Sequence, residues 1–195
     1  MAETIRGLYM RGWAPATGGN YSHRKADGTV RISRSGVNKA FFSPSDFMTV
    51  NAYGVATEAG APKPSAETPL HCAVYRLFDA GVVLHVHTVA NTVLSRYFKE
   101  KILFSGFELQ KVFAGQTTHA AEIALPVFEN SQDMPALAQE VEAYYRAREC
   151  SSPGFLLSGH GLYAWGKTLE ETERHLEAFE FLLACRLEMK KAGID

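Results

Sequence analysis

Residues 82–88 read VVLHVHT, a short apolar run that carries two histidines one residue apart. Its length and composition predict a strand buried in the core, followed by a helix near residues 91–98. Side chains two positions apart in a strand leave the same face, so His85 and His87 point together while Val86 points to the other face. The chain must therefore fold around a sheet that accepts two imidazoles on one face.

The rest of the chain supplies strands and helices in a mixed order. Residues 20–33 predict a β-hairpin that turns at Asp27 and Gly28, because polar and apolar residues roughly alternate on both arms. The other predicted elements are strands within residues 43–54 and 122–130, two strands within 154–166, and helices over 3–13, 67–78 and 135–149. A last helix starts near residue 169, where Thr168 and Glu171 indicate a capping box. The pattern is that of a mixed α/β layer protein with hairpins in its sheet.

Length, composition and charge limit the class of protein. With 195 residues, 46% of them apolar, the chain can close one core, and no repeat, low-complexity tract or linker divides it. We therefore predict a single domain over residues 1–195. The formal net charge of −1, without any block of like charge, argues against a nucleic-acid binder and favours a small-molecule partner.

The apolar runs and the cysteines indicate in which cellular compartment the protein is expected. The longest apolar stretches fall far short of the roughly 20 residues that a membrane span needs, and the N-terminus lacks the apolar core of a secretion signal. Cys72, Cys150 and Cys185 are widely spaced and form no CxxC pair. An odd number of cysteines without such pairs argues for reduced thiols. We therefore expect a soluble, cytoplasmic protein that does not bind membranes.

The two histidines of the buried run are candidate metal ligands. A catalytic zinc ion typically takes three protein ligands and keeps one position open, so a third donor is needed. His160, between glycines in SGHGLY, is the best candidate, because those glycines allow a sharp bend. His119 is a weaker alternative. The competing interpretation is that these histidines are separate core residues with ordinary hydrogen bonds. We favour a structural role for three others, which we expect in the hairpin (His23), in a helix (His71) and on a solvated helix (His175).

Two glutamates are candidates for proton transfer. Glu67 in PSAETPLH and Glu108 in FSGFELQKVF are flanked by apolar or small residues. Partial burial there would raise the pKa of a carboxyl group toward neutral pH and suit acid–base catalysis. The competing interpretations are a carboxylate at a helix N-terminus for Glu67 and an exposed residue of a first helical turn for Glu108.

Two glycine-bearing loops could hold an anion. The loops TGGN (residues 17–20) and SGVNK (residues 35–39) offer backbone N–H groups, hydroxyls and the ammonium of Lys39, which together suit a phosphate. Neither loop matches a P-loop or a dinucleotide-binding fingerprint, so nucleotide binding has no support. Ordinary glycine turns would also explain both loops.

Taken in order, the segments TGGNYS, SGVNK, KPSAETPLH, HVHT and SGHGLYAWG resemble the class II (zinc) aldolase superfamily of sugar-phosphate lyases and epimerases. The resemblance covers nearly the whole chain. It implies a central, mostly antiparallel sheet flanked by helices, and one zinc ion per subunit held by His85, His87 and His160. It also implies a group of residues around the substrate phosphate: Gly19, Asn20, Ser35, Gly36, Lys39 and Ser65.

Within the superfamily, the runs SGVNKAFFSPSDFMTV, GFELQKVF and HGLYAWGKTLEE are most similar to its sugar-phosphate dehydratases, which are hydro-lyases. For the acid–base group, the resemblance gives two answers. Aldolases use the glutamate at the position of Glu67, whereas eukaryotic dehydratases have cysteine there and use a glutamate that matches Glu108. This chain has both glutamates, and we favour Glu108 for a dehydration.

The resemblance further implies a homotetramer with the active site near a subunit boundary. Two alternatives remain open. The chain could be an aldolase or a 4-epimerase that acts on another sugar phosphate with the same metal and phosphate loops. It could also be a non-catalytic assembly module of the same fold, although such a module would be expected to lose the metal ligands.

Overall fold

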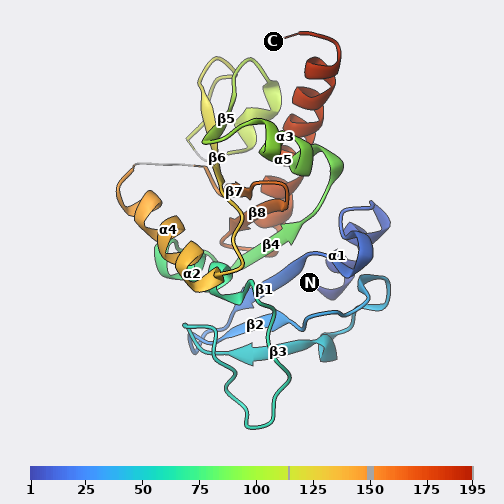
Figure 1. Ribbon diagram of the computed structural model, residues 1–195, viewed down its shortest axis with the longest axis vertical. Helices are drawn as coiled ribbons and strands as arrows, with labels where there is room; N and C mark the ends of the chain where they lie inside the picture. Colours follow the sequence, from blue (N-terminus) through green and yellow to red (C-terminus); the bar gives the residue numbers. More distant parts are fainter. Residues whose placement is uncertain (114, 149–151, 195) are drawn as a thin grey trace.

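The structure, a computed structural model, describes residues 1–113, 115–148 and 152–194 (Figure 1). In this part of the chain, eight strands form one sheet in the order β3-β2-β1-β4-β8-β7-β6-β5. All neighbouring strands are antiparallel except β6 and β7, which run parallel. The strands are β1 (Asn20–Arg24), β2 (Val30–Ser33), β3 (Phe47–Val50), β4 (Val82–Val86), β5 (Lys101–Phe104), β6 (Ile123–Phe128), β7 (Gly154–Leu157) and β8 (Gly161–Gly166). The predicted mostly antiparallel sheet is confirmed.

Strands β1 and β2 form the predicted hairpin. At its turn, Asp27 Oδ1 accepts a hydrogen bond from the backbone N–H of Thr29 at 2.9 Å, and Gly28 has a φ of +81°, which glycine adopts without strain. On its other edge β1 pairs with β4, where Asn20 lies opposite His85. The hairpin therefore brings the loop before β1 to the end of β4.

Strand β4 lies inside the sheet, and all five of its residues are buried. Leu84 and Val86 pack into one core cluster, while Val83 packs into a second cluster on the opposite face. His85 stacks on Tyr163 of this second cluster, with ring centroids 3.9 Å apart. The alternation that the sequence predicts along this strand is therefore present.

Helices cover both faces of the sheet. The described α-helices are α1 (Ala2–Met10), α2 (Thr68–Leu77), α3 (Val89–Tyr97), α4 (Met134–Arg146) and α5 (Leu169–Lys191). Helix α2 packs against α4 on one face, and α3 packs against α5 on the other (Figure 1). Short 3₁₀ turns lie between these elements: η1 (Pro15–Thr17), η2 (Lys39–Phe41), η3 (Pro44–Asp46) and η4 (Glu108–Val112). None of the described helices is long and apolar enough to cross a membrane.

Three local features differ from the sequence-based expectations. Strand β5 was not predicted, because Leu103 lies on its more exposed side and the apolar residues of this strand do not alternate with polar ones. The box at the start of α5 is shifted: Thr168 Oγ1 accepts the N–H of Glu171, but the Glu171 carboxylate accepts the N–H of Lys167. His175 is 5% exposed, whereas the sequence suggests a residue on a solvated helix.

Candidate metal centre

The histidines at positions 85, 87 and 160 meet at one end of the sheet. His85 lies in β4, His87 follows that strand directly, and His160 lies in the turn between β7 and β8. Because β4 pairs with β8 and Val86 lies opposite Leu162, this turn is placed beside the end of β4. One ring nitrogen of each histidine lies within 4.8 Å of the others.

Glycine makes this approach possible. A Cβ atom on Gly161 would lie 2.4 Å from the carbonyl oxygen of Val86 and 2.8 Å from Cε1 of His85. On the other side, a Cβ atom on Gly18 would lie 2.7 Å from Nδ1 of His87. All of these contacts are shorter than real Cβ contacts, so the two glycines leave the space that the imidazoles occupy.

The hydrogen bond of His85 shows which of its ring nitrogens has a free lone pair directed toward the cluster. The Nδ1–H of His85 donates to the carbonyl oxygen of Leu162 at 3.0 Å, which leaves Nε2 without a proton in the neutral ring. Burial lowers the pKa of His85 well below its ordinary value and lowers that of His87 to about 4. Both imidazoles are therefore neutral at physiological pH, and their Nε2 atoms lie 2.8 Å apart.

Glu67 lies against the same cluster. Its carboxylate oxygens are 3.4 Å from Nε2 of His85 and 3.2 Å from Nε2 of His160, and the Tyr163 hydroxyl donates to it at 3.1 Å. Burial by itself would raise the pKa of Glu67, but electrostatic attraction at His85 and hydrogen bonds from His160 and Asn20 outweigh it, so the pKa is lowered. Burial keeps the His85 ring neutral, so a bound cation would be the natural source of this attraction.

The donor set fits a divalent cation such as zinc. Three imidazoles and one carboxylate come together here, burial keeps His85 and His87 neutral, and Nδ1 of His160 is buried without a hydrogen-bond partner in the described residues. Nε2 of His85 lies 2.8 Å from Nε2 of His87, and the Glu67 carboxylate lies 3.2 Å from Nε2 of His160 and 3.4 Å from Nε2 of His85. Side chains this close together could hold one zinc ion at bond lengths of about 2.0–2.2 Å.

The predicted phosphate residues come from three loops around this cluster. Asn20 Nδ2 lies 3.5 Å from Ser65 Oγ, and Gly19 has a φ of +79° next to the backbone of His85. An isolated bridge between Arg34 and Pro64 brings the turn of residues 35–36 toward Ser65.

Lys39 is the positive group among these residues. Its side chain is 2% exposed, and Nζ donates to the carbonyl oxygen of Thr17 at 2.7 Å. Burial lowers the pKa of Lys39, while the negative charges of Glu67 and Asp46 oppose that change. The accepting loop contains Ala16 and Thr17 at φ of +49° and +64°, a strained conformation for residues other than glycine that clusters at ligand-binding sites.

The other glutamate, Glu108, does not belong to the histidine cluster. It opens η4 with a side chain that is 76% exposed, accepts a hydrogen bond from Lys111 Nζ at 2.7 Å, and lies 3.8 Å from Nδ1 of His119. The expectation of a raised pKa at both glutamates was wrong. The hydrogen bond from Lys111 lowers the pKa of Glu108, and the pKa of Glu67 is lowered as described above. His119, the alternative ligand, lies beside Glu108 and outside the cluster.

Sequence reasoning missed Tyr163 as a residue of this site. Its hydroxyl bonds to Glu67, and its ring stacks on His85 because the two residues are directly opposite in the β4–β8 pair. The sequence carries no signal for this neighbour, since the pairing register of two distant strands decides it.

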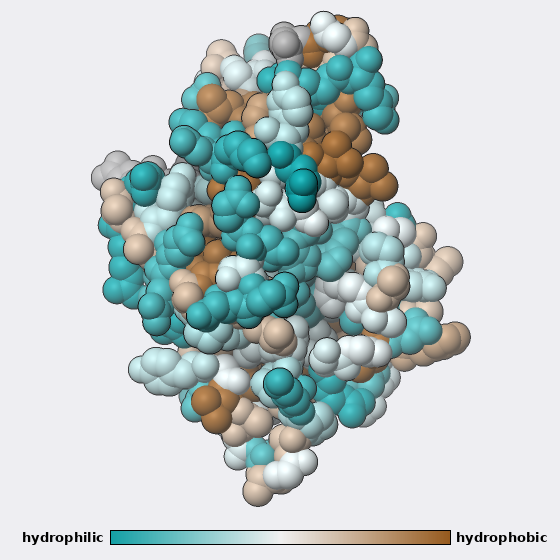
Figure 2. Space-filling model, viewed as in Figure 1, coloured by the Kyte–Doolittle hydropathy of each residue, from teal (hydrophilic) through white to brown (hydrophobic). Residues whose placement is uncertain are grey.

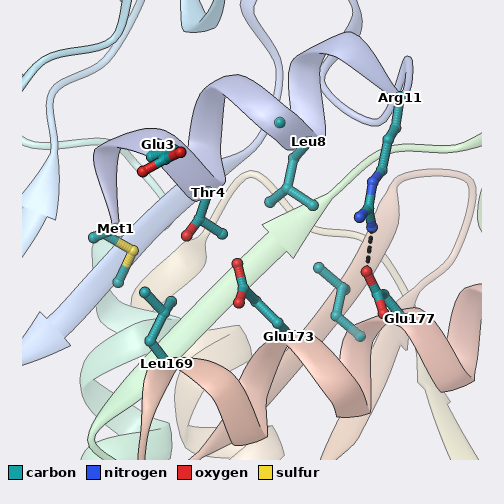
Figure 3. Close-up of a pocket in the computed structure, with 10 residues that line it drawn as sticks. Met1, Glu3, Thr4, Leu8, Arg11, Leu169, Glu173 and Glu177 are labelled. Carbon is teal, nitrogen blue, oxygen red and sulfur yellow. Dashed lines mark hydrogen bonds and ion pairs between the residues drawn. The ribbon is translucent and has the colours of Figure 1, made fainter.

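A separate cleft of about 400 Å³ lies between α1 and α5 (Figure 3). Glu3, Thr4, Glu173 and Leu169 line it, and Arg11 pairs with Glu177 at one end. None of the predicted site residues lines this cleft. The candidate site is therefore the histidine cluster.

A family model described as the class II aldolase and adducin N-terminal domain matches residues 1–187. Curated relatives match over nearly the same length. The methylthioribulose-1-phosphate dehydratase of Citrobacter koseri is 47% identical over 193 residues, which are 98% of this chain and 94% of that protein. The protein of the same name from Marinobacter nauticus is 46% identical over 191 residues, 96% of this chain and 91% of its own.

Solved structures support the fold. The l-fuculose-1-phosphate aldolase from Thermus thermophilus superposes with a TM-score of 0.78 at 24% identity, covering 98% of this chain and 94% of that one. A sugar-phosphate aldolase from Thermotoga maritima superposes with a TM-score of 0.67 at 16% identity, covering 100% and 94%. At such low identities the likeness establishes the fold alone.

Proposed function

Because the chain belongs to the class II aldolase and adducin N-terminal domain family, we propose that it is a methylthioribulose-1-phosphate dehydratase. This hydro-lyase converts 5-methylthioribulose 1-phosphate to 2,3-diketo-5-methylthiopentyl 1-phosphate and water, a step of methionine salvage. The observation that carries the proposal is the identity of 44–47% to curated relatives of that name. The convergence of His85, His87 and His160 supports a catalytic site and disfavours a non-catalytic assembly module.

The reaction is an elimination that needs proton transfer and no redox partner. A proton leaves C3, the hydroxyl leaves C4 as water, and the enol that results relaxes to the 2,3-diketone. A zinc ion, one per subunit, held by the three histidines would polarise substrate oxygens and so acidify the C3 proton. The chain itself has to supply a carboxylate that takes this proton and a carboxylic acid that protonates the departing hydroxyl.

Two glutamates are candidates for the proton transfer. Glu67 is the carboxylate that lies beside His85 and His160 within one chain. Glu108 is our preferred base, and its exposed place on η4 is consistent with reaching a site in a neighbouring subunit. In that arrangement Glu67 would lie beside the cation that the three histidines hold, and Glu108 of an adjacent copy would face the substrate.

The other end of the substrate is a phosphate. We assign it to Gly19, Asn20, Ser35, Gly36, Lys39 and Ser65. The buried ammonium of Lys39 supports this assignment, because its charge is not paired with a carboxylate at hydrogen-bond distance among the described residues and Thr17 supplies only a carbonyl oxygen. A dianionic phosphate would supply the missing counter-charge.

We further propose a cytoplasmic homotetramer. Helix α3 supports the assembly with an exposed apolar stripe: Val89, Val93 and Tyr97, four residues apart, are 74%, 46% and 62% exposed. Phe181 of α5 is 55% exposed. Figure 2 shows apolar side chains gathered at the upper right of the molecule, where α3 and α5 lie in Figure 1. Such patches mark protein contacts in soluble proteins.

Product analysis tests the function. Purified zinc-loaded protein is given 5-methylthioribulose 1-phosphate, and the products are followed by NMR and mass spectrometry. The proposal predicts loss of one water molecule and formation of the diketone. Cleavage between C3 and C4, or inversion at C4, would instead identify an aldolase or a 4-epimerase.

A further inference from the structure

A chain of polar side chains runs between α2 and β1, behind the histidine cluster. Glu67, His71 and Tyr75 are four residues apart, so they share one side of α2 and its N-cap. Asn20 and Ser22 are two residues apart and share one face of β1. The two sets interdigitate, and each member contacts the next.

The contacts are buried and continuous. Asn20 Nδ2 donates to Glu67, and Asn20 Oδ1 contacts Nε2 of His71. On the other side of the imidazole, Nδ1 of His71 lies 2.7 Å from Ser22 Oγ. Ser22 Oγ in turn lies 2.7 Å from the hydroxyl of Tyr75. His71 is completely buried and belongs to none of the groups that we assigned to the reaction.

The charge on Glu67 fixes the direction of these hydrogen bonds. An ionised carboxylate only accepts, so Asn20 must present its NH₂ group to Glu67 and its carbonyl oxygen to His71. The Nε2 atom of His71 must therefore carry a hydrogen.

The positions of the other hydrogens in this chain of polar side chains follow because the His71 imidazole is neutral. Burial lowers the pKa of His71 to about 4, so the ring is neutral and its Nδ1 carries no hydrogen. That atom accepts the hydroxyl hydrogen of Ser22, and Ser22 Oγ accepts from Tyr75. Every member of the chain then has one defined orientation.

We propose that His71 is a positioning residue of this enzyme: as the Nε2–H tautomer it fixes the carboxamide of Asn20, which holds the Glu67 carboxylate against His85 and His160. The inference rests on the proposed function for its kinetic consequence. Among the described residues, His71 forms hydrogen bonds with Ser22 and Asn20 and none with His85, His87 or His160, so it acts through Asn20. The alternative is a core histidine that packs edge-on to Tyr163 and contributes only stability.

The tautomer can be measured directly. Zinc-loaded protein labelled with ¹⁵N-histidine is studied by long-range ¹H–¹⁵N NMR at neutral pH, and the His71 signals are identified by their absence in His71→Gln. We expect a neutral ring with its hydrogen on Nε2. A hydrogen on Nδ1, or on both nitrogens, overturns the inference. This result does not depend on the activity, so it stands apart from a failure of the proposed function.

Kinetics separate positioning from stability. His71→Leu removes both hydrogen bonds, whereas the amide of His71→Gln can still donate toward Asn20. Loss of an outer hydrogen-bond partner of a metal site typically costs about 10–100-fold, so we expect kcat to fall roughly tenfold or more in His71→Leu and about threefold or less in His71→Gln.

A matched control is His175→Leu. His175 is also a buried histidine, and its Nδ1 bonds to the carbonyl oxygen of Trp165 at 2.7 Å, which is not part of the chain of polar side chains between α2 and β1. We expect this variant to lower the melting temperature as His71→Leu does, with little loss of kcat. Equal kcat losses in His71→Leu and His71→Gln, or losses that follow the melting temperature across all three variants, would overturn a positioning role. Wild-type protein without dehydratase activity would refute the proposed function instead.

Discussion

Glu67 and Glu108 differ in surroundings, and this difference can be tested residue by residue. Glu67 lies against two imidazoles, while Glu108 is exposed on η4. We expect Glu108→Gln to lower kcat at least roughly a hundredfold, the lower range for lost general acid–base catalysis. Steady-state kinetics on 5-methylthioribulose 1-phosphate, with metal content measured in parallel, provide the test. Full activity of Glu108→Gln would transfer the role to Glu67, for which the matched variant is Glu67→Gln.

Glu180 predicts a pH dependence of stability. This carboxyl group of α5 is 5% exposed and accepts hydrogen bonds from Thr88 Oγ1 and Asn91 Nδ2. Burial raises its pKa to about 7 from an ordinary 4.5, and the two donors offset only part of the change. Between these pH values the folded state binds a proton that the unfolded state has lost, so the free energy of unfolding should fall as pH rises through this window.

The pKa shift of Glu180 sets how much stability is lost. The free energy of unfolding should fall by about 3 kcal/mol as the pH rises from 4.5 to about 7. Glu180→Gln does not titrate, so urea unfolding should show the wild type losing stability relative to this variant as pH rises. Parallel stability curves for the two proteins would contradict a raised pKa.

Among single residues, the sequence allowed us to predict the site residues that local spacing identifies. Two histidines at alternate strand positions and one between glycines were identifiable as candidates, and the structure brings them together. Tyr163 and the contacts of His71 could not be predicted, because they depend on the register of β8 against β4 and of α2 against β1. Burial could not be predicted either, as the exposed Glu108 shows.

Among the elements, the end of β4 and the start of β8 have to approach closely for the site to form. Gly161→Ala would place a Cβ atom 2.4 Å from the backbone oxygen of Val86, so a strand has to move. We expect a loss of roughly 2–3 kcal/mol in the free energy of unfolding, the upper part of the usual range for one substitution. Zinc content should fall as well, because the shift displaces His160.

Gly7→Ala is the matched control. Gly7 lies in α1, and a Cβ atom there would meet nothing within 4 Å. Replacing glycine by alanine inside a helix usually stabilises it by roughly 1 kcal/mol, so urea unfolding should give the opposite sign for this variant. Unchanged stability and zinc content in Gly161→Ala would contradict the close approach.

Elements with strong local signals were predictable. The hairpin of β1 and β2 has its Asp-Gly turn, and α5 has a long apolar periodicity with Thr168 as N-cap. Strand β5 lacked such a signal, since it is short and its more exposed side includes a leucine. The order of the strands in the sheet could not be predicted from local sequence patterns, because β4 pairs with β1 and β8, which are both distant in sequence.

For the whole molecule, the proposed tetramer gives the apolar stripe of α3 a role. Val93→Glu puts a charge in the middle of the stripe without touching the described core, since Val93 is 46% exposed. We expect a smaller oligomer by light scattering after size exclusion, and a loss of dehydratase activity if the base comes from a neighbouring subunit. Val55→Glu, at a 61% exposed valine in the loop after β3 and outside this stripe, serves as the control and should leave the mass unchanged. An unchanged mass in Val93→Glu would exclude this stripe as the interface.

The proposed dehydration depends on three imidazoles that hold one cation. Metal analysis of purified protein by plasma mass spectrometry, together with activity before and after chelation, tests this most directly. We predict about one zinc ion per chain in the wild type, the stoichiometry of a mononuclear site. We predict little bound metal in His160→Gln, and activity that disappears with the chelator and returns with zinc. Wild-type protein that dehydrates its substrate without any divalent metal would contradict a catalytic role for this metal centre.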